Sequence, residues 1–451
     1  MNLETNSNRH ISAMTPHSHS YFSAETFYRL VVIAIILRVA IMPLFGHVDL
    51  LSEARRIFFW DESGIYFDDI SRNATALFQL MFFKVFSIFI ENKEVLFGHA
   101  DMARSTASPS AYFEFVSQPN IFRAIFIIKL PFLAADLITA WAIYQYCDRT
   151  AGAKNAVLFW LFNPMTIFAF YIFGRFESIP IMFCMLSLLA MQRQRLILSA
   201  CLIGLSVNSR ELFIFLGPLF LALVCSPSCK QYGLKTRIIA FAIVAIAIAI
   251  AVQLISLTGS ATDSFGREVT SIASEGRVDY LFAFKIGSFV VFPMVYLFLL
   301  LYAWNSHVDL NDKAIVIYAL MMISFFCLSS HTAHYTSWMV MFPCVFLAFN
   351  NNLLKPMLLL CITWFVFNLS ITDLGVFTTW LASPWSINLA GLPNFPQMYQ
   401  ALGLTNVIDM LTFQRLSRTF YGACLIFIGA LILRAYLQQI NHTEVNHRGE
   451  S

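Results

Sequence analysis

Residues 155–191 read NAVLFWLFNPMTIFAFYIFGRFESIPIMFCMLSLLAM, and Arg175 and Glu177 are the only charged residues among them. They divide the stretch into two apolar runs, 155–174 and 177–191, whose lengths approach the roughly 20 residues that a helix needs to span a bilayer. The apolar residues are continuous and do not alternate with polar ones, which favours helices in lipid over the strands of a membrane barrel. We therefore predict two membrane helices joined by a short charged turn.

The composition extends this pattern to the whole chain of 451 residues. Hydrophobic residues make up 58% and charged residues 12%, whereas soluble proteins carry about 25% charged residues. Too few charges are present to cover a water-facing surface, and the net charge of +3 is too small to attract a polyanion along the chain. These values exclude a soluble enzyme, a disordered protein, a coiled coil and a nucleic-acid binder. They indicate a polytopic membrane protein.

Apolar runs of spanning length predict an all-α, polytopic membrane helical bundle of about 12 spans, with a range of roughly 11–13. The first run is 29–46, and it follows a polar tail, 1–28, that we expect to be disordered on the cytosolic side. The remaining runs are 121–146, 155–174, 177–191, 196–209, 211–225, 238–257, 281–303, 314–330, 335–349, 354–373 and 419–440. A single membrane domain over 29–440 and a cytosolic tail over 441–451 complete the predicted organisation.

The positive-inside rule predicts the side of each loop. Short basic connectors would share a side with both termini, and the long segments 47–120, 258–280 and 374–418 would lie on the opposite, outer side. This assignment requires that the run 74–90 does not cross, so that it is an amphipathic helix on the outer face or a re-entrant element. The large first outer loop should thus bear juxtamembrane helices. The membrane would be the inner or cell membrane of a bacterium or the endoplasmic reticulum of a eukaryote, with the long loops on the periplasmic or lumenal side.

Two acids follow the first predicted span and are candidates for catalysis. Asp49 lies where the span leaves the membrane, and a carboxylate at that depth suits a general base that acts on a hydroxyl. Glu53 lies one helical turn later and could share the same face. The alternative interpretation of Asp49 is a solvated acid at the interface that ends the helix.

Ionisable residues inside predicted spans are costly, so they are usually functional or paired. Asp136 lies within the run 121–146, and Lys129, seven residues earlier, falls near the same helical face. A structural Lys129–Asp136 coupling is therefore at least as plausible as a catalytic role. Arg38 in the first span would pair with an acid from another helix or neutralise a lipid phosphate. Asn163, followed by Pro164, is expected to break the helix backbone inside the membrane.

Three further charged residues lie at the outer ends of predicted spans. Arg175 and Glu177 follow one span and Arg210 follows another, so all three would face the same outer cavity. Arg175 is assigned a role in shaping the site.

The ordered set Asp49, Asp136, Asn163-Pro164, Gly174 to Glu177 and Arg210 resembles the GT-C superfamily of polyprenyl-phosphate-sugar-dependent glycosyltransferases. Within it, the set is most similar to mannosyltransferases of the GPI mannosyltransferase I type and their bacterial relatives. The resemblance covers about 45–220 and rests on order and spacing. The family's Asp-x-Asp is reduced here to Val48-Asp49-Leu50, which argues against a metal held by two adjacent carboxylates. Glu177 stands where the family has an acid after Gly-x-x, and Arg210 stands where Lys is common. The resemblance thus implies substrate and phosphate binding for Glu177 and Arg210, and a guanidinium group can contact phosphate through two parallel bonds.

Further outer residues fit a site for the lipid phosphate of a donor. Arg267 and Arg277 in the loop 258–280 could bind that phosphate by charge-assisted hydrogen bonds, or they could belong to a solvated, self-paired charged loop. The segment from His331 through His334 to Tyr335 weakly resembles a His/Tyr element that opens a late span in the family. For the two histidines three roles stay open: donors to phosphate, a metal pair, or polar residues of the interface. Tyr335 is grouped with them as a substrate-binding candidate.

The resemblance implies transfer of a sugar, with mannose favoured, from a polyprenyl or dolichyl phosphate to a hydroxyl of a glycan, lipid or protein acceptor, with inversion. Asp49 would deprotonate the acceptor. The lipid phosphate is a good leaving group, so no metal cofactor is required, although a divalent metal stays an open alternative. Two other functions stay open: a transporter or lipid flippase, and a non-catalytic subunit of a glycosylation complex with a partner subunit.

Overall fold

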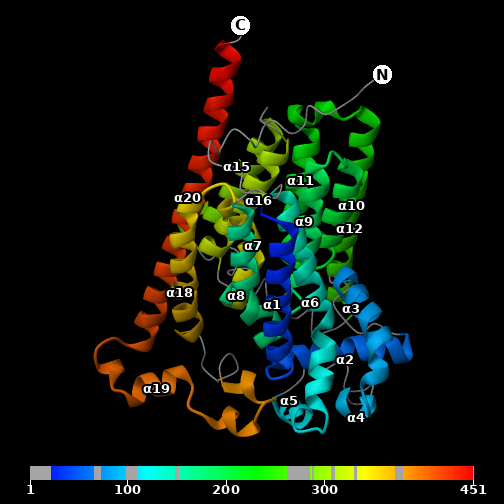
Figure 1. Cartoon of the computed structure of the whole chain (residues 1–451), viewed down its shortest axis with the longest axis vertical. Helices are drawn as coiled ribbons and strands as arrows, with labels where there is room; N and C mark the ends of the chain where they lie inside the picture. The colour runs from blue at the N-terminus through cyan, green and yellow to red at the C-terminus, as the bar shows by residue number, and fades with distance from the viewer. Residues whose placement is uncertain are drawn as a thin grey trace.

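The computed structural model describes residues 22–64, 73–97, 109–147, 152–261, 285–286, 289–305, 310–329, 333–370 and 379–449. Within these ranges the chain is an all-α bundle, as predicted, and its only strands are the two-residue β1 (Lys285–Ile286) and β2 (Phe289–Val290). Figure 1 shows long helices side by side and short helices gathered at one end. We name this end the loop end. It is formed by α2 (Val48–Ser63), α3 (Asn73–Phe86), α4 (Lys93–Phe97), α5 (Pro109–Val116) and α19 (Phe395–Ala401).

The first helix, α1 (Ala24–Ile41), begins inside the stretch that was predicted as a polar tail, 1–28. Ser23 caps the helix, because its side chain accepts the backbone N–H of Thr26 at 3.2 Å. Phe22 and Phe27 are buried against the ring of Tyr144. The end of the predicted tail is therefore helical and packed against the bundle, and residues 1–21 lie outside the described ranges.

Most predicted spans coincide with helices of the bundle. The helices are α6 (Ile121–Tyr146), α7 (Ala153–Phe162), α8 (Pro164–Ile167), η5 (Phe168–Phe173), α9 (Ser178–Gln192), α10 (Leu196–Val207), η6 (Glu211–Phe215), α11 (Leu216–Cys225), α12 (Leu234–Ala261), α15 (Val291–Asn305), α16 (Leu310–Leu328), α17 (Ser337–Leu347), α18 (Leu354–Ser370) and α20 (Met410–Gly449). Helix α9 packs against both α6 and α10, and α18 packs along α20. Helix α20 continues through most of the predicted tail 441–451.

Five helical stretches in the described residues are long and apolar enough to cross a membrane. They are Ala153–Phe173, Leu234–Val252, Leu310–Leu328, Asn351–Ser370 and Met410–Gln438. Six other apolar helices have 10–17 residues. Large apolar side chains such as Ile246 on α12 and Phe427 on α20 are exposed, as expected for contact with lipid. The chain is a polytopic membrane bundle, and the number of about 12 spans stays a prediction because several helices are short.

The predicted break at Asn163 and Pro164 separates α7 from α8. Asn163 caps α8, because its side-chain oxygen accepts the backbone N–H of Met165 at 2.7 Å. Pro164 takes the first position of α8, where a backbone N–H has no partner within the helix. The missing N–H of proline therefore removes no hydrogen bond there. Helix α8 continues into η5, a π-helix that ends at Gly174. The prediction that this residue pair breaks the helix is confirmed.

Helix α3 covers most of the run 74–90, whose crossing was uncertain from the sequence. It is 14 residues long, and Figure 1 shows it beside α2 at the loop end. In its first turn Ala74 N–H donates to Asn208 O at 3.2 Å, and Thr75 Oγ1 donates to Ser209 O at 2.9 Å. These bonds hold α3 against the end of α10, as expected of a juxtamembrane helix.

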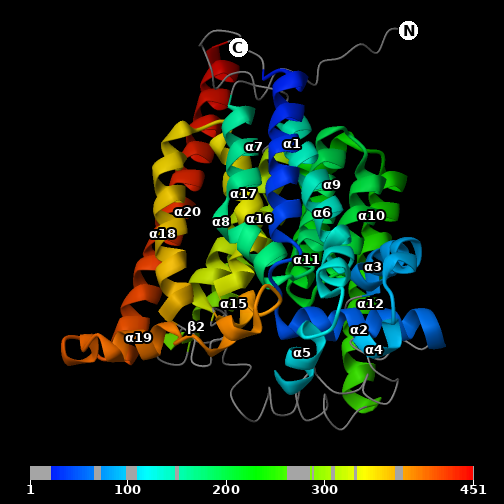
Figure 2. The ribbon, with the colours of Figure 1, turned by 60° about the horizontal axis from the view of Figure 1, so that its bottom comes forward.

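Both ends of the described chain point to the same end of the bundle. Figure 2 shows the start of α1 and the end of α20 at the end of the bundle opposite the loop end. The first and last predicted outer segments meet around Gly46, whose N–H donates to Leu381 O at 2.9 Å and whose carbonyl accepts from Tyr112 Oη at 2.5 Å. This arrangement agrees with the predicted parity of the spans. The side of the membrane that each end faces stays a prediction.

Candidate functional site

Asp49 is placed by the start of α2. His47 is the N-cap of this helix, and its Nδ1 accepts the backbone N–H of Asp49 at 3.1 Å. The imidazole stacks on Phe173 with the ring centroids 3.8 Å apart. Asp49 lies in the first turn, where the helix dipole favours a negative charge. The cap therefore holds the Asp49 carboxylate at the helix N-terminus beside the end of η5.

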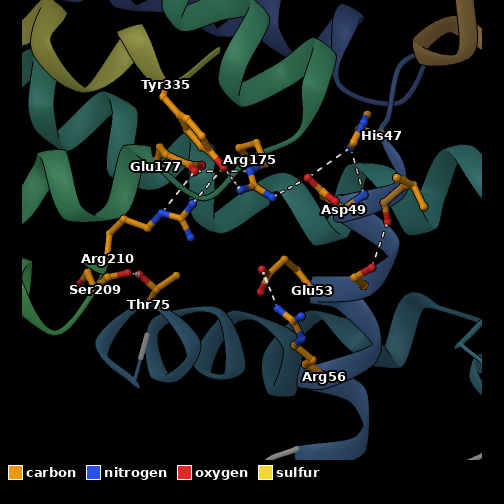
Figure 3. Close-up of polar contacts among 12 residues, drawn as sticks. His47, Asp49, Glu53, Arg56, Thr75, Arg175, Glu177, Ser209, Arg210 and Tyr335 are labelled. Carbon is orange, nitrogen blue, oxygen red and sulfur yellow. Dashed lines mark hydrogen bonds and ion pairs between the residues drawn. The ribbon is translucent and has the colours of Figure 1, made fainter. Parts of the chain in front are cut away.

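The turn after η5 places Arg175 and Glu177. Gly174 ends the π-helix with φ +84°, a backbone conformation that residues with a Cβ atom rarely adopt. A Cβ at this position would also lie 3.0 Å from Lys129 Cε. Glycine is thus required for both its conformation and its close approach to α6. The turn carries Arg175 toward α2 and Glu177 toward Arg210 (Figure 3).

Four charged side chains of alternating sign lie in one line, which we name the charge chain (Figure 3). Arg175 Nη1 is 2.7 Å from Asp49 Oδ2, and Arg175 Nε is 3.3 Å from Glu177 Oε1. Arg210 Nε is 3.9 Å from the same Glu177 oxygen. The charge chain joins the first outer segment to the ends of η5 and α10. The structure brings these residues together, and both the shared outer cavity and their roles stay predictions.

Tyr335 lies beside the charge chain and contacts both of its arginines. It lies in η8 (Ala333–Thr336), and its hydroxyl accepts from Arg175 Nη2 at 3.3 Å and from Arg210 Nη2 at 3.2 Å. The Arg210 guanidinium also lies 5.3 Å from the ring centre of Phe176 and 5.5 Å from that of Trp338. Aromatic faces stabilise a cation at these distances. Two guanidinium groups therefore donate to one oxygen atom.

The structure separates the other predicted site residues from the charge chain or leaves them undescribed. Glu53 is buried and pairs with Arg56 at 3.0 Å. Only the backbone of His334 is described, within η8. Arg267, Arg277 and His331 lie outside the described residues. Of the two predicted acids of the first outer segment, Asp49 pairs with Arg175 and Glu53 pairs with Arg56.

Asp136 is paired, but not with Lys129. Its Oδ2 accepts from Arg38 Nε at 2.7 Å and from Tyr171 Oη at 2.6 Å, and the side chains of Arg38 and Asp136 are 0% exposed. The alternative that Arg38 pairs with an acid of another helix is confirmed, and the Lys129–Asp136 coupling is wrong. Side chains on a helix lean toward its N-terminus, so Lys129 extends away from Asp136.

Sequence reasoning missed the contacts of Lys129, Tyr171 and Trp338. Lys129 donates to three backbone carbonyls, and Tyr171 joins the Arg38–Asp136 pair. A lysine near the end of an apolar run could have been recognised as a candidate for capping helix ends. No sequence signal distinguishes Tyr171 or Trp338 from the other aromatic residues of the spans.

No group of three metal-binding side chains occurs among the residues that the structure describes. Metal dependence therefore stays open. A groove lies elsewhere, between α16, α17 and α20, and its lining includes Ile315, Phe346 and Tyr436. None of the predicted site residues lines this groove, so it is not the candidate site.

His47 should make stability depend on pH. Burial lowers the pKa of its imidazole and outweighs the opposite effect of Asp49, and the nearby Arg175 adds a smaller effect that also lowers it. The unfolded chain would bind a proton below about pH 6.5 while the folded chain would not, so stability should fall as pH falls from about 7 to about 5. Protonation would also remove the Nδ1 lone pair that caps α2. Melting temperatures measured across this range in detergent check the prediction.

His47→Gln is the matched variant for this measurement, because its amide oxygen can accept a hydrogen bond and does not titrate. We expect its melting temperature to depend less on pH than that of the wild type. Equal pH slopes for the two proteins would show that His47 does not titrate in this way.

These features define the class: an all-helical, polytopic membrane protein with a cluster of alternating charges at its loop end. The family model described as GPI transamidase subunit PIG-U matches residues 107–275. The match covers less than half of the chain, includes Arg175, Glu177 and Arg210, and excludes Asp49 and Tyr335. A transamidase subunit is not a mannosyltransferase, so this match does not support the mannosyltransferase part of the predicted resemblance.

Comparison with other known proteins adds little. No curated protein matches the chain. Among solved structures, the chain is similar to the crystal structure of ArnT from Cupriavidus metallidurans bound to undecaprenyl phosphate, with 13% identity and a TM-score of 0.48. The similarity covers 92% of this chain and 78% of the other. A likeness this distant does not bear on function.

Proposed function

We propose that the chain is a membrane glycosyltransferase that moves a sugar from a polyprenyl phosphate to an acceptor hydroxyl at the loop end. The observation that carries this proposal is the uneven exposure of the charge chain. The Asp49 side chain is 39% exposed, whereas those of Arg175, Glu177 and Arg210 are 7%, 1% and 6% exposed. A carboxylate that substrate can reach thus lies against the shielded guanidinium group of Arg175, and a second shielded guanidinium group, that of Arg210, lies on the other side of Glu177. This is the combination that a general base and an anion site require.

The Tyr335 hydroxyl marks a position that suits a phosphate oxygen. It accepts N–H groups from both Arg175 and Arg210. A phosphate oxygen would accept the same groups more strongly, because hydrogen bonds between ions are about twice as strong as neutral ones. Donor binding would therefore displace the hydroxyl and draw Arg175 away from Asp49. The carboxylate would then be available to the acceptor.

In the proposed reaction the acceptor hydroxyl gives its proton to Asp49 while its oxygen attacks the anomeric carbon. The bond between that carbon and the phosphate oxygen breaks, and the lipid phosphate leaves with the electron pair. Arg175 and Arg210 stabilise the charge that develops on the phosphate. A single displacement of this kind inverts the anomeric carbon.

A membrane assay with a radiolabelled polyprenyl-phosphate sugar tests the proposed function. Wild-type membranes should transfer label to an acceptor, and membranes without the protein should not. The sugar favoured by the sequence is mannose, and the acceptor is a glycan, lipid or protein. A series of labelled donors compared in the same assay identifies the sugar.

Replacing Arg210 by Ala should weaken the binding of polyprenyl phosphate. One charged hydrogen bond contributes about 1.5–3 kcal/mol, so the dissociation constant should rise by roughly 10- to 100-fold. Titration of the protein in nanodiscs with polyprenyl phosphate measures this change.

Arg123→Ala is the matched control, because Arg123 is half exposed and pairs with Glu91 near the loop end. It should bind polyprenyl phosphate as the wild type does. If Arg210→Ala also binds like the wild type, Arg210 is not a phosphate ligand.

A second candidate function is a non-catalytic subunit of a complex that handles a glycolipid. The match to a GPI transamidase subunit favours it, because the matched residues include the cationic half of the charge chain and exclude Asp49. Such a subunit would bind a lipid phosphate through Arg175 and Arg210 and would not need the Asp49 base. Lipid binding without sugar transfer is the result that distinguishes this function from the first.

A further inference from the structure

Lys129 lies inside α6 with no exposed surface. Its Nζ donates to three backbone carbonyls, Met42 O at 3.0 Å, Phe45 O at 2.5 Å and Tyr171 O at 2.6 Å. A neutral amine has only two N–H groups, whereas an ammonium has three. Only the ammonium form can make all three bonds at once.

Two of the three carbonyls lie at the C-terminal ends of helices, and the third lies in the segment that follows α1. Met42 is the C-cap of α1, and Phe45 lies three residues beyond it. Tyr171 lies in the last turn of η5. The last carbonyls of a helix have no partner within it and carry partial negative charge, so a cation placed among them is stabilising. One ammonium thus caps α1 and η5 together.

Each capped helix leads directly into one partner of the Asp49–Arg175 ion pair. Asp49 comes four residues after Phe45, and Arg175 comes four residues after Tyr171. The Cβ that Gly174 lacks would lie 3.0 Å from Lys129 Cε, so the chain passes directly over the lysine before it reaches Arg175. The same side chain therefore sets where both segments leave the bundle.

We propose that Lys129 is a positioning residue that fixes the segments 42–49 and 171–177 relative to each other, and thereby holds Asp49 and Arg175 in register. It does not touch the substrate. The effect on local order follows from the contacts alone. The effect on sugar transfer rests on the function proposed above.

Lys129→Met tests the proposal, because methionine keeps much of the side-chain length and removes all three donors. Hydrogen exchange measured by mass spectrometry in nanodiscs should be about 10-fold faster or more in 42–49 and 171–177. Exchange in α18 should match the wild type, because α18 lies outside the two segments. Sugar transfer should fall on the order of 100-fold, as expected when reacting groups shift by about 1 Å.

Lys84→Met is the matched control, because Lys84 is an exposed lysine of α3 that also lies at the loop end. Its exchange in both segments and its sugar transfer should match the wild type. If the wild type itself transfers no sugar, the proposed function fails, but the exchange data still decide the role of Lys129.

Chemical rescue separates the charge from the volume of the side chain. In Lys129→Ala, n-propylammonium supplies the missing atoms together with the ammonium, and 1-propanol supplies a similar volume without the charge. Only n-propylammonium should slow exchange in 42–49 and 171–177. If Lys129→Met does not fold, Lys129→Gln, which keeps two N–H groups, replaces it in the exchange measurement.

Three results would overturn the proposal. Exchange in the two segments could equal that of the wild type in the folded variant. It could rise equally in α18, which would mean a general loss of stability. Equal rescue by 1-propanol would mean that Lys129 only fills space.

Discussion

Replacing Asp49 by Asn should remove most sugar transfer while the amount of folded protein stays near that of the wild type. The amide keeps the size of the side chain and an acceptor oxygen for Arg175, but it cannot take a proton from the acceptor hydroxyl. General-base catalysis contributes about 10²–10⁴-fold, so the barrier should rise by about 3–5 kcal/mol. The initial rate of label transfer in membranes that contain equal amounts of each protein measures the effect.

Two other acids of α2 serve as comparisons that show whether the loss of transfer is specific to Asp49. Asp61 lies on the same helix, pairs with Lys84 at 3.7 Å, and is not part of the charge chain, so Asp61→Asn should transfer sugar like the wild type. Glu53→Gln tests the rival base. Near-full transfer by Asp49→Asn with loss in Glu53→Gln would move the base to Glu53. If neither substitution reduces transfer, the first outer segment supplies no base and the non-catalytic function is favoured.

Replacing Asp136 by Leu should cause a large loss of stability. The variant leaves the Arg38 guanidinium charged and fully buried, and it removes the acceptor of the Tyr171 hydroxyl. Breaking a buried ion pair by removing one partner costs about 3–5 kcal/mol. The free energy of unfolding, measured by titration with a denaturing detergent in mixed micelles, should fall by this amount.

The double variant Arg38→Met with Asp136→Leu is the decisive comparison, because it removes both charges. It should recover most of the lost stability, since apolar replacement of a whole buried pair is often neutral. Arg29→Met breaks the exposed Arg29–Glu25 pair instead and should change the free energy of unfolding by less than about 1 kcal/mol. If the double variant is as unstable as the sum of the two single variants, the loss comes from packing rather than from an unpaired charge.

The class of fold could be predicted from the sequence because it follows from composition and from the length of apolar runs. The boundaries of α6 agree with the predicted run 121–146, and the break at Asn163 agrees with the helix geometry that proline imposes. The predicted tail 1–28 extends too far, because the Ser23 cap and the packing of Phe22 and Phe27 are not visible in hydropathy.

The candidate site could be predicted only in part. The positions of Asp49, Arg175, Glu177 and Arg210 at the ends of apolar runs indicated that they share one end of the bundle. Their order in the charge chain and the bridging role of Tyr335 depend on how η5, α10 and η8 approach one another. Hydropathy contains no information about that approach, because it depends on side chains of separate helices.

The sequence by itself determined that the chain is a helical membrane bundle and which charged residues lie at its loop end, because both depend on local order along the chain. Only the tertiary structure decided which charges meet. Periodicity along one helix placed Lys129 and Asp136 on one face and suggested a pair, whereas Asp136 is bonded to Arg38, 98 residues away, and Lys129 is bonded to carbonyls of two other segments. The physical reason is that a buried charge takes the partner that packing brings within about 3 Å, and packing between helices is not encoded in the spacing of residues within one helix.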